Sequence, residues 1–170
     1  MDNGFLFAVD YVLNNEGGLV ENSSDPGGIT NFGISLRFYR ENINAESGGD
    51  SIKSLTKEDA IKIYYAHFWN KWYEDIYHQE ITDRVLDTAV SCGIATANKI
   101  LQRSVWGCAG NQKVEDSGIL DAKNLSSINY FGTNILYPFR VERAYYYRDL
   151  VNKNPDLSKF LAVWLTRAYR

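Results

Sequence analysis

Cysteine, histidine and proline are scarce in this 170-residue sequence, which contains two, two and three of them, respectively. Two thiols and two imidazoles without tight metal spacing argue against a zinc site. Cys92 and Cys108 lie in segments with helical patterning, so small buried apolar side chains are favoured over a disulfide. We therefore expect no metal ion and no organic cofactor.

Long hydrophobic runs and an excess of positive charge are also missing. No run of about 18 apolar residues is present, so a membrane span is not expected. Residues 1–4 carry no basic side chain and Asp10 interrupts the next apolar segment, so no cleavable signal peptide is predicted and we expect synthesis in the cytoplasm. The formal net charge of −3, without a basic stripe, disfavours nucleic-acid binding. Hydrophobic residues make up 45% of the chain, enough for a core.

Glu16 stands at the end of the first apolar segment and is followed by Gly17 and Gly18. Glu16 continues the i, i+3, i+4, i+7, i+8 face of a predicted helix, formed by Phe5, Ala8, Val9, Val12 and Leu13. The glycine pair predicts a left-handed cap that ends this helix. Burial and the negative end of a helix dipole both raise the pKa of a carboxyl in such a place, and a general acid must stay protonated. The alternative is a glutamate that points to solvent.

A turn-rich segment follows Glu16 and runs from Asp25 to Ile34. Its proline and glycines predict tight turns, and Leu19-Val20 and Ile29 to Ile34 are predicted as the short strands of a small hairpin. A chain that turns back here would hold Asp25, Thr30 and Asn31 beside Glu16. Glycoside hydrolysis commonly uses two carboxyls around one cleft. The alternative is a solvated turn in which Asp25 only caps the backbone.

Together, Glu-Gly-Gly at 16–18, Asp-Pro-Gly-Gly at 25–28 and Thr-Asn-Phe-Gly-Ile at 30–34 resemble the signature of glycoside hydrolase family 108. These are lysozyme-like N-acetylmuramidases, including phage endolysins and proteins once called secretion activators. The resemblance implies cleavage of peptidoglycan, with Glu16 as catalytic acid. The Glu…Asp…Thr order is also similar to that of phage lysozymes. On that analogy Asp25 and Thr30 would position or activate water, and Asn31 would lie beside them as a substrate-binding residue.

Aromatic residues mark the helix predicted after Thr56, which forms a capping-box pattern with Asp59. Aromatic rings stack on the apolar faces of sugars, so Tyr65 and Trp69 are candidate substrate-binding residues. The alternative is core packing, which their helical spacing also favours. A similar helix follows the hairpin in the family named above, and the matching residues here are Ala60, Tyr64 and Trp69.

A second strongly helical stretch covers about Asp83 to Trp106, and Gly93 allows close helix approach or a break within it. This stretch resembles the central helix of the family, except that Ser91 stands where the family pattern has Asn. Ser91 is therefore a candidate substrate-binding residue if that position touches the glycan, and a brace between helices otherwise. Asp87 is a candidate second carboxylate, although an ion pair between packed helices is favoured.

The last third of the chain begins with a polar, glycine-rich connection. We therefore divide the chain into a lysozyme-like catalytic portion, residues 1–106, and a C-terminal helical portion, residues 107–170, packed as one compact unit. The segment 118–125 faintly resembles the peptidoglycan-binding portion of the family, and Ser158 is a possible cap of the last helix. The predicted fold is mainly α, a lysozyme-like α+β helical bundle with one small β-hairpin beside the active-site cleft.

The function indicated is hydrolysis of the β-1,4 bond between N-acetylmuramic acid and N-acetylglucosamine, with Glu16 as general acid. A lytic transglycosylase, a chitin-directed hydrolase and a non-catalytic wall-binding or assembly module stay open as alternatives. The acidic net charge counts against a wall lysin, because cationic proteins are attracted to anionic walls. We expect a monomer whose partner is peptidoglycan. A holin, tail structure or secretion system would deliver it, and the sequence indicates no particular inhibitor or immunity protein.

Overall fold

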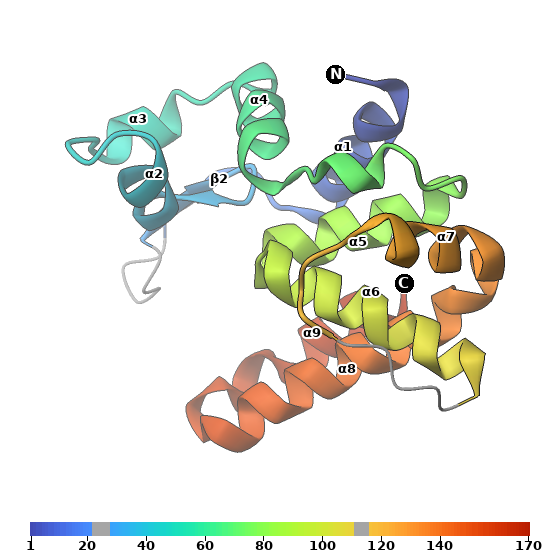
Figure 1. Cartoon of the computed structure of the whole chain (residues 1–170). Coiled ribbons are helices and arrows are strands. Elements are labelled where there is room, and N and C mark those ends of the chain that lie inside the picture. Colours follow the sequence, from blue (N-terminus) through green and yellow to red (C-terminus); the bar gives the residue numbers. More distant parts are fainter. Residues whose placement is uncertain (22–27, 111–115) are drawn as a thin grey trace. The chain divides into compact units, whose positions relative to one another are not determined.

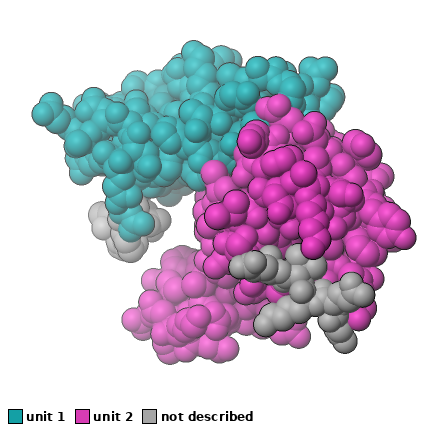
Figure 2. All heavy atoms as spheres, in the orientation of Figure 1, with its two compact units in different colours: residues 1–69 teal, residues 70–170 magenta. Residues whose placement is uncertain are grey.

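The computed structural model describes residues 1–21, 28–110 and 116–170 (Figure 1). Asp25, one of the predicted catalytic residues, falls outside these ranges. The chain forms two compact units, residues 1–69 and residues 70–170, which Figure 2 shows in separate colours. The division expected after residue 106 falls inside a helix of the second unit, so the compact units divide the chain at a different place.

The first unit combines helices with a small antiparallel sheet of strand order β1-β2-β3. Its elements are α1 (Asn3–Asn15), β1 (Val20–Glu21), β2 (Ile29–Asn31), β3 (Ile34–Ser35), α2 (Leu36–Asn42), α3 (Gly49–Lys53) and α4 (Lys57–Phe68). The predicted hairpin is confirmed, because β1 pairs with β2, but the segment 29–34 forms two strands, β2 and β3, instead of one.

Short-range sequence signals set where the helices of the first unit begin. The carboxylate of Asp2 accepts a hydrogen bond from the Phe5 N–H at the start of α1. The Ser35 hydroxyl does the same for the Phe38 N–H in α2. The predicted capping box of Thr56 at the start of α4 is confirmed. The inward face of α1 is also confirmed, because its buried residues are Phe5, Ala8, Val9 and Val12.

The second unit is a helical bundle in which α6 packs against α5 and α8, and α8 packs against α9. Its elements are η1 (Lys71–Tyr73), α5 (Gln79–Cys92), α6 (Ile94–Ala109), α7 (Ala122–Phe131), η2 (Gly132–Ile135), α8 (Leu136–Lys153), η3 (Pro155–Leu157) and α9 (Ser158–Tyr169). In the described parts of the chain, no helix is long and apolar enough to cross a bilayer.

Gly93 breaks the long helical stretch into α5 and α6, since its φ of 86° lies in a region that only glycine adopts easily. Cys92 and Cys108, on these two helices, are free thiols, so the preference for unpaired cysteines is confirmed. The expected cap at Ser158 is wrong, because Ser158 is already the first helical residue of α9 and its side chain makes no cap. Asn154 caps the preceding turn η3 instead.

Candidate active site

Glu16 is the residue that follows α1, where the backbone leaves the helix, and its side chain is half-buried. Its N–H still donates to the Val12 carbonyl oxygen at 3.0 Å, but its backbone is extended, with φ −88° and ψ 143°. The expected left-handed glycine cap is therefore wrong: neither Gly17 nor Gly18 has a positive φ. Both glycines are exposed, and no heavy atom lies within 4 Å of the place where a Cβ would be. The backbone of Gly17 and Gly18, next to Glu16, is therefore open to solvent and not covered by other side chains.

The β2–β3 turn supplies the surface against which Glu16 lies. Asn31 pairs with Ile34, which leaves Phe32 and Gly33 as a two-residue loop. Both loop residues have positive φ, 50° and 76°, as the type I′ turn of a tight hairpin requires. Glycine adopts this conformation at no cost, whereas Phe32 needs support from its surroundings.

Tyr64 of α4 gives the turn that support. Its side chain is fully buried, and its hydroxyl donates a hydrogen bond to the Phe32 carbonyl oxygen at 2.5 Å. A Cβ on Gly33 would lie 2.6 Å from the Tyr64 oxygen and 2.9 Å from both Cγ and Cδ of Glu16. Only glycine fits at this position, and the absence of a side chain lets the phenol and the carboxyl approach the turn together.

The other two predicted residues of the hairpin lie on β2 with different surroundings. Asn31 is 6% exposed, and its amide nitrogen donates to the carbonyl oxygens of Ile52 and Leu55 at 3.0 and 3.4 Å. Thr30 is half-buried and pairs with Val20 and Ser35 across the sheet. Because successive strand residues point to opposite faces, Thr30 and Asn31 face away from each other.

Tyr65 and Trp69 both pack against Phe5 of α1. Their rings meet the Phe5 ring edge-to-face, with centroid distances of 4.9 and 5.1 Å. Both side chains are only half-buried, so each also presents part of its surface to solvent. Core packing, the alternative considered for these aromatic residues, therefore accounts for one side of each ring.

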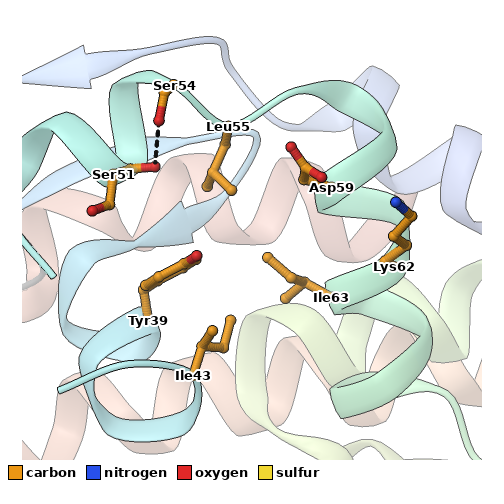
Figure 3. Close-up of a pocket in the computed structure, with 8 residues that line it drawn as sticks. All are labelled: Tyr39, Ile43, Ser51, Ser54, Leu55, Asp59, Lys62 and Ile63. Atoms are coloured by element: carbon orange, nitrogen blue, oxygen red, sulfur yellow. Dashed lines mark hydrogen bonds between the residues drawn. The ribbon is translucent and has the colours of Figure 1, made fainter.

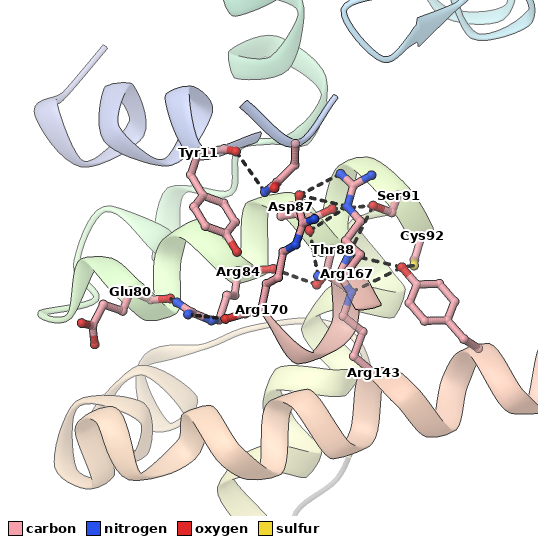
Figure 4. A network of polar contacts seen from close by, with 12 residues as sticks. Tyr11, Glu80, Arg84, Asp87, Thr88, Ser91, Cys92, Arg143, Arg167 and Arg170 are labelled. Atoms are coloured by element: carbon pink, nitrogen blue, oxygen red, sulfur yellow. Dashed lines mark hydrogen bonds and ion pairs between the residues drawn. The ribbon is translucent and has the colours of Figure 1, made fainter. Parts of the chain in front are cut away.

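Ser91 lies in the second unit and belongs to a polar network around Asp87 (Figure 4). Its hydroxyl donates to the Asp87 carbonyl oxygen at 2.7 Å and accepts from Arg143 at 3.4 Å. The Asp87 carboxylate is 1% exposed and forms ion pairs with Arg143 and Arg167, each at 2.7 Å. The favoured interpretation of Asp87, an ion pair between packed helices, is confirmed: it joins α5 to α8 and α9.

Elsewhere on the first unit, a hollow of about 470 Å³ opens between α2, α3 and α4 (Figure 3). None of the predicted site residues that the structure describes lines it; the lining residues are Tyr39, Ile43, Ser51, Ser54, Leu55, Asp59, Lys62 and Ile63. For metal ions, the described residues contain no cluster of three or more His, Cys, Asp or Glu side chains.

Tyr64 is the site residue that sequence reasoning missed. The sequence placed it on the aromatic helix, but its contacts with the hairpin join residues 32 positions apart. A local signal exists only for the turn, where Asn31 and Gly33 are residue types that favour a tight hairpin. Nothing in the spacing of α4 indicates which of its tyrosines would reach that turn.

A helical protein with a small antiparallel sheet, whose first helix ends at a glutamate held against a hairpin turn, has the lysozyme-like α+β architecture. The sequence pattern of the glycosyl hydrolase 108 family matches residues 9–93, half of the chain, and the protein belongs to that family. The chain is similar to the solved structure of Brucella abortus SagA, with a TM-score of 0.71 and 27% sequence identity over 96% of this chain and 92% of that one. No curated protein matches it.

Membership of this family makes the protein a glycoside hydrolase of the lysozyme-like, peptidoglycan-directed kind. The matched range contains the first unit from residue 9 onward and α5, and it includes every residue that the sequence assigned to the site.

Proposed function

We propose that this protein is an N-acetylmuramidase that hydrolyses the β-1,4 bond between N-acetylmuramic acid and N-acetylglucosamine, with Glu16 as general acid. Glu16 would protonate the glycosidic oxygen as positive charge develops on the sugar ring. Cleavage of this bond in intact walls would make the enzyme bacteriolytic.

The placement of the Glu16 carboxyl is the observation that carries this proposal. The carboxyl is half-buried against the Phe32-Gly33 turn, while Gly17 and Gly18 leave the neighbouring backbone exposed and free of side chains. A general acid needs both features, because it must be held in a defined position and must still be reached by the bond that it protonates.

The remaining candidates would act around this acid in different ways. Asp25 or a water held by Thr30 would meet the developing charge or attack the anomeric carbon, since Thr30 faces away from the buried Asn31. Asn31 would support the site by binding the carbonyl oxygens of Ile52 and Leu55 at the end of α3. The exposed parts of Tyr65 and Trp69 would contact sugar faces. The Ser91 hydroxyl, which already donates its proton to Asp87, would accept a hydrogen bond from the glycan.

The test is turbidity loss of purified peptidoglycan with the wild type and with Glu16→Gln. This substitution removes the acid with little change in shape, so activity should fall on the order of 10²-fold or more. Glu46→Gln is the matched control, because it removes a carboxylate from an exposed loop of the same unit and should leave the rate unchanged. Equal activity of Glu16→Gln and the wild type would refute the assignment.

The products distinguish the proposed hydrolase from the alternatives. A hydrolase leaves reducing ends that are heavier by one water than the anhydro ends of a lytic transglycosylase, which mass spectrometry resolves. Release of muramic acid at the reducing end identifies the muramidase bond, and cleavage of chitin instead of peptidoglycan would indicate the chitin-directed alternative. Binding to walls without any cleavage would favour a wall-binding or assembly module.

We propose further that residues 107–170 help to hold the wall polymer and that the enzyme acts on the wall as a monomer. Sedimentation of wild-type protein and of a Tyr137→Ala variant with purified walls tests the first part, because Tyr137 is 74% exposed on α8 of this portion. Light scattering tests the second.

A further inference from the structure

Tyr64 occupies an unusual position for a buried tyrosine, because its polar end meets backbone in a strained conformation. The residue is 0% exposed, and its hydroxyl bonds to the carbonyl of Phe32, whose φ of 50° is rare for a residue with a side chain. Backbone in this region persists only where neighbouring groups hold it. The Tyr64 hydroxyl is therefore a support of the turn and not merely a filler of the core.

Glu16 depends on the same turn. The Glu16 Cδ and the Tyr64 oxygen lie 2.9 and 2.6 Å from the point that a Cβ on Gly33 would occupy, so both flank the same glycine. Any movement of the turn would change the space available to the carboxyl. The position of Glu16 is thus tied to α4 through a contact that joins three separate segments of the first unit.

We propose that Tyr64 is the positioning residue for the acid: its hydroxyl holds the Phe32-Gly33 turn, and the turn and the hydroxyl together hold Glu16 where it can protonate the glycosidic oxygen. The catalytic part of this inference rests on the proposed role of Glu16.

The first test is the kinetics of Tyr64→Phe, which keeps the ring and removes the hydroxyl. We expect kcat to fall about 10- to 100-fold, as displacement of a catalytic group does. KM should be unchanged, since the buried Tyr64 does not reach the glycan.

Tyr73→Phe is the matched control. Tyr73 is also buried, at 1% exposure, and its hydroxyl donates to the Asn98 side-chain oxygen at 2.7 Å. Its substitution removes a comparable buried hydrogen bond from the second unit, so any loss of stability should be similar. The kcat of Tyr73→Phe should stay within about twofold of the wild-type value if the effect of Tyr64 is specific.

Gly33→Ala tests the turn from its other side. The added methyl would collide with both Tyr64 and Glu16, so kcat should fall at least as far as in Tyr64→Phe. Gly110→Ala is its control, because Gly110 also has a positive φ, 65°, but no heavy atom lies within 4 Å of the added methyl. The control carries the backbone cost without the collision.

A carboxyl ¹³C spectrum separates this inference from the proposed function. The Glu16 carboxyl resonance is identified by its loss in Glu16→Gln, and we expect its chemical shift to change in Tyr64→Phe but not in Tyr73→Phe, because only Tyr64 lies beside the turn that holds Glu16. If the wild type cleaves no peptidoglycan, the proposed function fails and this chemical shift alone decides whether Tyr64 positions Glu16. An unchanged chemical shift in Tyr64→Phe, or an unchanged kcat in an active enzyme, would overturn the inference.

Discussion

The two compact units each hold a carboxyl group next to packed helices, and the surroundings of these carboxyls differ. In the second unit, Asp87 is 1% exposed and lies between two guanidinium groups, those of Arg143 and Arg167. In the first unit, Glu16 is half-buried at the end of α1, beside a phenol hydroxyl and a glycine turn. Burial of an acid therefore does not identify a catalytic group. The chemistry of its neighbours separates Asp87, which joins helices, from Glu16, which we propose as the proton donor.

Asp87→Asn should have the largest effect on stability. It leaves the buried Arg143 without its countercharge, and breaking a buried pair in this way costs about 3–5 kcal/mol. Urea unfolding of the variant measures this cost, and Glu16→Gln should stay within about 0.5 kcal/mol of the wild type in the same assay. Similar losses in the two variants would remove the distinction between the two carboxyls.

Arg143→Gln and Arg167→Gln compare the contributions of the two arginine partners of Asp87 to the stability of the second unit. Arg143 is 2% exposed in its side chain and Arg167 is 20% exposed, so water screens the Arg167 pair more strongly. We expect Arg143→Gln to cost about 3 kcal/mol or more and Arg167→Gln less, in denaturant unfolding. A larger loss for Arg167→Gln would show that α9 contributes more than α8 to the network.

Thr56→Ala should have the smallest effect, about 1 kcal/mol, because it removes the cap of the helix that carries Tyr64. Hydrogen bonds from the Thr56 side chain and backbone lower the pKa of Asp59, so the carboxylate form is the one that stabilises the folded protein. This contribution is present above the unfolded pKa of about 3.9 and is lost as the pH falls through the lower folded value. Unfolding at pH 7 and pH 3 measures it, and a larger difference between variant and wild type at pH 3 would contradict this account.

Much of the fold is predictable because it depends on residues close together in the chain. The inward face of α1, the caps at Ser35 and Thr56, and the break at Gly93 each depend on neighbours within a few positions. Predictions that used one residue type alone were less reliable. Gly17 and Gly18 do not cap α1, since Glu16 itself leaves the helix, and Ser158 does not cap α9.

The sequence by itself determined the family, the helical elements and the location of Glu16 at a helix end, because periodicity, capping and short motifs act over a few residues. Tertiary structure decided which groups surround each carboxyl. The contact of Tyr64 with the Phe32 carbonyl spans 32 positions, and that of Arg167 with Asp87 spans 80. Such contacts form only when packing has brought distant segments together, and no local pattern of apolar residues specifies which polar side chains will then meet.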